Sequence, residues 1–188
     1  SARGGSLGGK GGFIETSAHE NLLGTAWLNV NTTAPLGMAG AWILDPSNFI
    51  INTGNAPTFA ATLNAGNNLY IQTGSGSGAG DIILNPNVNL SWTSSADLTL
   101  LAYRHITFNS NAKINHTSGT GSLNLRADST GTGTGTINFS SGSGVNFAGS
   151  SGDVNFFYNP SSYSSPTNFS SRVTMGTGTF TPYMLVNS

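Results

Sequence analysis

Three ten-residue segments of this chain align with one another without a gap, and this internal repeat limits the fold more than any other feature. The segments span residues 81–90, 105–114 and 136–145. Their second, fourth and tenth positions are apolar in every copy, and turn-forming residues fill the middle. Self-similarity of this kind is typical of a solenoid, in which each repeat packs only on its neighbours.

A second repeated element lies between these segments, a short run of alternating apolar and polar residues that predicts one β-strand. Its apolar pairs begin at Leu69, Leu98, Leu123 and Val154, which are spaced 29, 25 and 31 residues apart. Each cycle therefore contains one strand of this kind and two shorter strands inside the ten-residue segment. We predict an all-β fold, a right-handed parallel β-helix with roughly three short strands per coil.

The prediction treats residues 1–188 as a single β-helical segment of a larger or processed protein. Further strands are expected at residues 13–16, 27–30, 41–44, 49–51 and 180–186. Long loops are expected where Gly, Ser, Thr and Pro accumulate, at residues 74–80, 130–135 and 160–171. No helix is expected, because no run keeps a 3.6-residue apolar period long enough and Gly or Pro interrupts most windows.

Strand alternation separates the side chains into an interior set and a surface set. Leu, Ile, Val and Phe of successive coils are expected to stack about 4.8 Å apart along the axis. The outward positions form two rows, Tyr70, Thr99, Asn124 and Asn155 in one and Thr107 with Asn138 in the other. Short polar side chains can hydrogen-bond along such a stack. We predict that these two rows form a contact ladder on the protein surface.

Composition excludes several classes of protein. Charged residues make up only 7% of the chain and the formal net charge is −1, which argues against nucleic acid as a partner. A hydrophobic content of 37% argues against disorder. No run is apolar over the roughly 20 residues that a membrane-spanning helix needs, so no membrane insertion is expected. The absence of cysteine excludes a disulfide framework and Cys-ligated metals.

The acidic residues offer one candidate for catalysis. Asp97 and Asp153 precede equivalent strands two coils apart, a separation of about 9.6 Å. That is at or beyond the roughly 6.5–9.5 Å between the carboxyl groups of an inverting glycosidase. Turn capping is therefore the preferred interpretation for both residues. Asp97, Arg104 and His105 are also close in sequence, and a surface ion pair is expected there.

Histidine and tryptophan give no stronger signal. His19, His105 and His116 lack the spacing of helical zinc motifs and are expected to be ordinary solvated side chains. Trp27, Trp42 and Trp92 are candidates for stacking on sugars. Trp27 and Trp42 stand in apolar runs, which favours core positions for them. We therefore expect no metal site, no cofactor and no catalytic residue.

Two segments near the amino terminus carry a family resemblance. Gly11-Gly-Phe-Ile-Glu-Thr-Ser17 is followed by Ala34-Pro-Leu-Gly-Met-Ala-Gly-Ala-Trp-Ile-Leu-Asp-Pro46. Together they resemble a paired motif of large bacterial exoproteins of the filamentous-haemagglutinin and high-molecular-weight-adhesin type. The motif-bearing match covers about residues 8–51, and it departs from the family pattern at Ala18, where Gly is usual, and at Ile43.

This resemblance implies a secreted protein at the bacterial cell surface or in the extracellular space, exported by two-partner secretion through an outer-membrane transporter. It implies a role in adhesion, with a host surface, a glycan or copies of the chain itself as partners, and it carries over no catalytic residue. The sequence therefore predicts a structural or adhesive module that attaches to surfaces or assembles into filaments. The alternatives are a carbohydrate-active β-helix enzyme and a passive stalk that presents a toxin.

Overall fold

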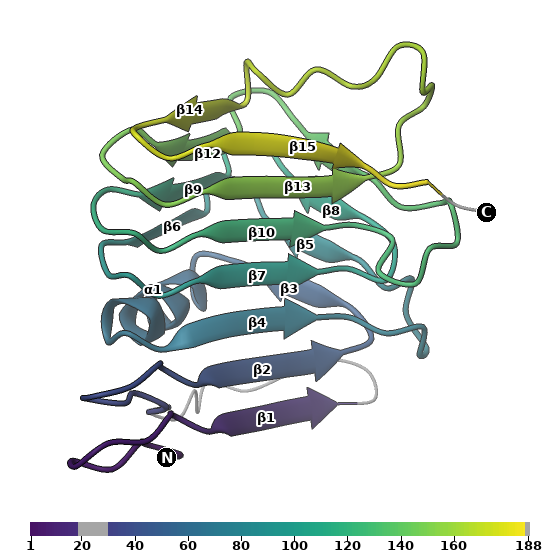
Figure 1. Ribbon diagram of the computed structural model, residues 1–188. Helices are drawn as coiled ribbons and strands as arrows, with labels where there is room; N and C mark the ends of the chain where they lie inside the picture. The colour runs from purple at the N-terminus through teal and green to yellow at the C-terminus, as the bar shows by residue number, and fades with distance from the viewer. Residues whose placement is uncertain (19–29, 187–188) are drawn as a thin grey trace.

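The chain forms a right-handed parallel β-helix of about six turns, seen in the computed structural model in Figure 1. The structure describes residues 1–18 and 30–186. One face is a seven-stranded sheet in which every neighbouring pair is parallel. Its strands, in spatial order, are β1 (Phe13–Ala18), β2 (Ala41–Pro46), β4 (Asn68–Gln72), β7 (Leu98–Leu101), β10 (Leu123–Arg126), β13 (Val154–Tyr158) and β15 (Phe180–Met184).

Two four-stranded parallel sheets complete the coils. The second sheet contains β3 (Phe49–Ile51), β5 (Ile82–Leu84), β8 (Ile106–Phe108) and β11 (Ile137–Phe139). The third contains β6 (Asn89–Trp92), β9 (Lys113–His116), β12 (Gly144–Phe147) and β14 (Val173–Met175). Ile106 pairs in parallel with Ile82 on one side and with Ile137 on the other. The repeat seen in the sequence is therefore the coil repeat of the fold, as predicted.

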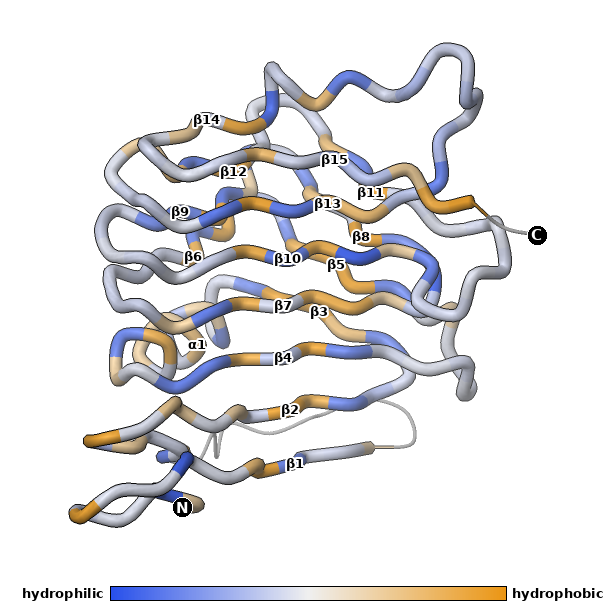
Figure 2. The backbone as a smooth tube through the Cα atoms, viewed as in Figure 1, coloured by the Kyte–Doolittle hydropathy of each residue, from blue (hydrophilic) through white to orange (hydrophobic). Residues whose placement is uncertain are grey.

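The core consists of apolar columns that run along the helix axis. Leu98, Leu123 and Val154 are fully buried and occupy one column of the seven-stranded sheet. In the second sheet the rings of Phe108 and Phe139 stack with centroids 4.5 Å apart. Figure 2 shows apolar residues, in orange, recurring between more polar ones along strands of the large sheet such as β4 and β10. Burying each such side chain contributes roughly 1.5–3 kcal/mol, which stabilises every coil against its neighbours.

The prediction that the chain contains no helix is wrong, because α1 (Ala56–Asn64) lies between β3 and β4. Pro57 stands in the first turn of the helix, and Phe59 and Leu63 are fully buried. The helix packs on β4 and β6, and the Phe59 ring lies 6.1 Å from that of Trp42. Nine residues are too few for a helix to be stable alone. Tertiary packing holds α1 at the end of the third sheet (Figure 1).

The first third and the loops follow the predicted pattern with one exception. Strands β1, β2 and β3 occupy three of the four predicted positions. Of the predicted strand at 27–30, residues 27–29 lie outside the described part of the chain, and Val30 belongs to no strand. Residues 74–80 and 130–135 contain no helix or strand. Residues 159–172 likewise form a long connection, whose Phe169 is buried against Phe156 and Tyr158.

The last strand of the large sheet carries a proline at its outer edge. The Val154 N–H donates to Thr179 O, and the Leu185 N–H donates back to Tyr158 O. Backbone groups of a strand alternate in direction, so residues 180, 182 and 184 face away from β13. Pro182 therefore stands at the open edge, where it offers no N–H to a further strand.

Candidate functional site

The first predicted contact row is a continuous column on the outside of the seven-stranded sheet. Tyr70 pairs with Thr99, Thr99 with Asn124, and Asn124 with Asn155 in successive parallel registers. The Asn155 Nδ2 donates to the Asn124 Oδ1 across 3.0 Å. Tyr70 is 39% exposed and the other three side chains are half-buried. The structure thus brings these four residues together, and their role in contact remains a prediction.

The second predicted row lies on a different face. Thr107 pairs with Asn138 in the second sheet, and the same column continues through Ile83 to Ile50. Ile50 and Ile83 make this column more apolar than the first at its β3 end, where Ile50 is 46% exposed. The six predicted residues therefore form two separate rows on two sheets rather than one surface.

A third row, next to the first, was not predicted as a candidate. The Arg126 guanidinium lies 5.9 Å from the centre of the Phe157 ring, and that ring stacks on Tyr183 with 4.6 Å between centroids and 8° between planes. All three point outward from consecutive strands of the large sheet. Strand alternation would have placed Arg126 and Phe157 there, because they follow the inward Leu125 and Phe156. The register of β13 with β15 then aligns Tyr183 with Phe157.

Polar residues at or just before the start of the strands of the large sheet are joined by hydrogen bonds along the axis. We call this row the first corner ladder. Asn68 Oδ1 accepts from the Asp97 N–H at 2.9 Å, and Asp97 Oδ1 accepts from the Ser122 N–H at 2.8 Å. Ser122 Oγ accepts from the Asp153 N–H at 3.3 Å, and Asp153 Oδ1 accepts from the Thr179 N–H at 2.8 Å. The Thr179 bonds hold the pKa of Asp153 below its ordinary value. The two aspartates, expected to cap turns, thus bind the backbone of the next coil, 25 and 26 residues along the chain, rather than their own turn.

A second corner ladder precedes the strands of the second sheet. Asn48 Oδ1 accepts from the Asp81 N–H at 3.0 Å, Asp81 Oδ1 from the His105 N–H at 3.1 Å, and His105 Nδ1 from the Thr136 N–H at 3.1 Å. The same geometry recurs in three bonds that link four successive coils, with Asn, Asp and His as the acceptor side chains. What these positions share is a side chain that reaches the backbone N–H of the next coil.

The Arg104 ion pair uses a different partner from the one that sequence proximity suggested. Its Nε and Nη2 bind the two carboxylate oxygens of Asp81 at 2.9 and 2.6 Å. Asp81 lies 23 residues earlier but one coil below, whereas Asp97 takes part in the first corner ladder. The Arg104 guanidinium is the main cause that lowers the pKa of Asp81, aided by the His105 N–H and opposed by burial.

The prediction that His116 is a solvated side chain is wrong, because His116 is fully buried. Its ring stacks on Trp92 at 4.6 Å. Nε2 lies 2.7 Å from the Ser94 carbonyl and must carry a proton, so Nδ1 accepts from Ser150 Oγ at 2.7 Å. Burial lowers the pKa of His116. The sequence contained a signal for this burial, because His116 stands two residues after the inward Ile114 and so faces the same side of the strand.

Two of the three tryptophans lie in the core, and the third lies outside the described residues. Trp42 and Trp92 are both buried, which confirms the core position expected for Trp42 and leaves Trp92 unable to stack on a sugar. Trp27 and His19 lie outside the described residues.

Each acidic residue of the described chain accepts at least one hydrogen bond from another part of the protein. Beyond the ladders, Glu15 accepts from Ser17 and Asp45 accepts from Gln72. Asp128 is fully buried with a φ of 52°. Burial opposes ionisation of its carboxylate most strongly, yet bonds from Asn159, Thr132 and Gly133 together outweigh burial and lower its pKa. Within residues 1–18 and 30–186, no three of the His, Asp and Glu side chains gather as metal ligands would.

No helix in the described ranges is long and apolar enough to cross a membrane. Comparison with known proteins adds no relative: no protein-family model, no curated protein and no solved structure matches the chain.

Proposed function

We propose that this chain is a structural and adhesive module of a secreted bacterial surface protein, a segment of an exoprotein of the filamentous-haemagglutinin type. It would cross the outer membrane through a dedicated transporter and act outside the cell. There it attaches to a host surface or glycan, or to copies of itself in filaments. The observation that carries the proposal is the outward face of the seven-stranded sheet, with its column of Tyr70, Thr99, Asn124 and Asn155.

The column suits attachment because its side chains are held in place before any partner arrives. Asn124 and Asn155 bind each other, and the first corner ladder fixes the backbone at the start of each strand. Binding through rigid groups loses little conformational entropy. The column also offers hydroxyl and amide groups at a repeat of about 4.8 Å, so that an extended partner can make several weak contacts at once.

The glycines of the resemblance motif have a structural role that supports the family assignment. A Cβ on Gly11 would lie 1.8 Å from Thr32 O, and a Cβ on Gly40 would lie 1.9 Å from Gly12 O. The two halves of the motif thus form adjacent coils, β1 and β2, whose backbones approach too closely for any side chain. This contact accounts for glycine at these positions on physical grounds.

Binding of the purified chain to a glycan array and to an epithelial-cell layer tests the proposal, with electron microscopy for filaments. We expect the double variant Asn124→Ala/Asn155→Ala to lose attachment. Ser75→Ala/Ser77→Ala, in an exposed loop, is the matched control and should bind normally. A chain that neither attaches nor forms filaments would contradict the proposal, as would full attachment by the Asn124/Asn155 double variant.

A further inference from the structure

The outside of the third sheet contains a recess between two basic side chains. Lys113 pairs with Gly144 on the next coil, and Gly144 lies beside Arg172 on the coil after that, since the Val145 N–H donates to Arg172 O. Gly144 contributes no side chain, so Lys113 and Arg172 are separated by two coil spacings, about 9.6 Å. The gap is a recess of about 390 Å³, with Asn115 and Asn146 on its wall.

The basic groups of this recess are not neutralised. Arg172 Nη1 donates to the Ser140 carbonyl at 3.0 Å, which holds the guanidinium at the rim. Within the described chain its Nε and Nη2 have no hydrogen-bond partner, and neither does the Lys113 ammonium. By contrast, Arg104 is paired with Asp81. Among the described residues, none that lines the recess is acidic.

Amide groups add neutral donors to the same recess. Asn146 Oδ1 accepts from the Ala148 N–H at 3.1 Å, which orients the side chain and leaves its Nδ2 available to donate. Asn115 is oriented in turn by a bond from its Nδ2 to Asn89 Oδ1 at 2.5 Å. Two cations and an amide donor around a polar hollow are the groups that bind an anionic oxygen.

We propose that this recess binds a single oxyanion, a carboxylate, sulfate or phosphate group, between Lys113 and Arg172. The assignment goes beyond the adhesive role proposed for the seven-stranded sheet and does not depend on it. Charge supports the class of ligand, because two of the chain's six Lys and Arg residues face this one hollow in a protein of net charge −1. Two cations are too few to follow the backbone of a nucleic acid, which needs a longer basic surface.

Titration of the isotopically labelled chain, followed by NMR, tests the proposal. The probes are sodium sulfate, sodium phosphate, glucuronate and, as the uncharged control, glucose. We expect the three anions to shift the Gly144 and Asn146 amide signals and glucose to leave them unchanged. An affinity that falls from sulfate through phosphate to glucuronate, in the order of their charge near neutral pH, would show that the recess recognises charge alone. Tighter binding of glucuronate would show that it also contacts the sugar that carries the group.

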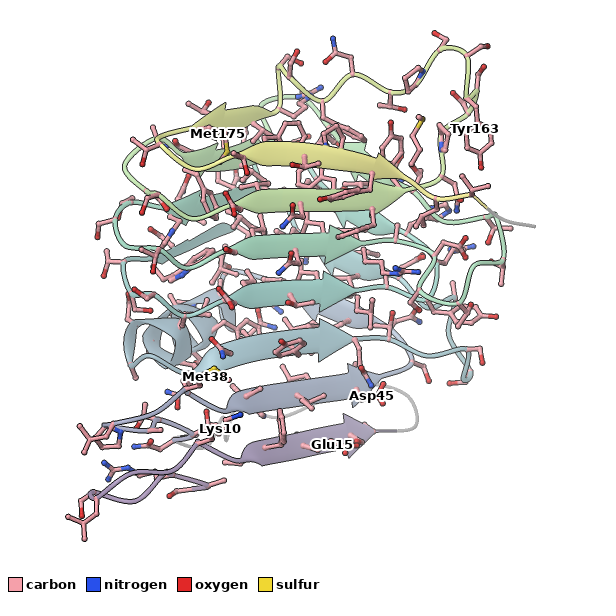
Figure 3. The ribbon with its side chains drawn as sticks, in the orientation of Figure 1. Lys10, Glu15, Met38, Asp45, Tyr163 and Met175 are labelled. Atoms are coloured by element: carbon pink, nitrogen blue, oxygen red, sulfur yellow. The ribbon has the colours of Figure 1, made fainter. Side chains whose placement is uncertain are left out.

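Variants that remove one positive charge at different places locate the bound anion. Lys113→Gln should weaken sulfate binding by about tenfold, because charge-assisted bonds are about twice as strong as neutral ones. Lys10→Gln, an exposed change beside β1 at the amino-terminal end of the β-helix (Figure 3), is the control and should bind as the parent does. Arg172 also contacts Ser140, so its replacement could disturb the local structure. We therefore compare Arg172→Gln with Arg172→Lys, which keeps the charge and should bind sulfate more tightly than Arg172→Gln does. Unchanged binding by Lys113→Gln, or shifts in the glucose titration, would overturn the assignment.

Discussion

Replacing Asp97 tests whether the side chains of the first corner ladder stabilise the stacking of the coils. In Asp97→Ala the Ser122 N–H loses its acceptor, the carboxylate oxygen 2.8 Å away. Asp97→Asn keeps an oxygen at that place. Asn68 already makes the equivalent bond in the coil below, to the Asp97 N–H at 2.9 Å. The two substitutions therefore separate the hydrogen bond from the charge.

The size of the effect follows from the bond that is lost. A hydrogen bond to a charged group contributes about 1.5–3 kcal/mol, and an unsatisfied buried N–H costs about 1–3 kcal/mol. The Ser122 bond is only partly buried, so water recovers some of the loss. We expect Asp97→Ala to lower the free energy of unfolding by about 1–2 kcal/mol. In Asp97→Asn the hydrogen bond is retained but its acceptor is neutral. The free energy of unfolding should therefore fall by less than about 1 kcal/mol.

Urea unfolding measures the difference. With a slope of about 2 kcal/mol per molar urea, the midpoint for Asp97→Ala should fall by about 0.5–1 M. Hydrogen exchange adds a local measurement, since the Ser122 amide should lose protection while the Asn124 amide in the same strand keeps it. Equal destabilisation by the Ala and Asn substitutions would show that charge, not the hydrogen bond, matters. An unchanged midpoint for Asp97→Ala would refute the ladder as a source of stability.

Three further predictions address packing, pH and association. Gly152→Ala should destabilise the fold by about 1–3 kcal/mol, the usual range for overpacking, because its Cβ would lie 1.9 Å from Gly121 O. Gly74→Ala, with nothing within 4 Å of its Cβ, is the control in the same thermal melt. Because burial lowers the pKa of His116 in the folded chain, unfolding experiments across pH should show stability that is complete above about pH 6.5 and declines as the pH falls. A flat profile between pH 7 and 5 would contradict the burial of a neutral imidazole. Pro182→Thr restores an N–H at the open edge of β15 and should increase concentration-dependent association in sedimentation, whereas equal sedimentation of both chains would show that this edge plays no part.

The coil repeat could be predicted from the sequence because a solenoid is a local structure repeated. Ile82, Ile106 and Ile137 lie at the same position of three aligned segments, and any fold that buries all three in equivalent environments must stack them. Strand alternation then divides inward from outward side chains without further information. The outward column from Tyr70 to Asn155 followed from these two rules alone.

The features that sequence analysis missed depend on distances between coils. Helix α1 is stable only because Phe59 and Leu63 find buried contacts with the coils around them, and nine residues carry too weak a period to show this beforehand. The partner of Arg104 is Asp81, one coil below, rather than the nearer-numbered Asp97. The recess between Lys113 and Arg172 exists because Gly144 separates them on the intervening coil.

By itself the amino-acid sequence determined the class of fold, the coil length and the side of the sheet on which each strand residue lies, because these depend on periodicity along one chain. Only the tertiary structure decided which polar groups meet. Coils differ in length, because loops such as 74–80 and 130–135 change the spacing along the sequence without changing how the strands of successive coils stack. Hydrogen bonds and ion pairs act over about 3–4 Å, so they depend on this axial neighbourhood and not on separation along the chain.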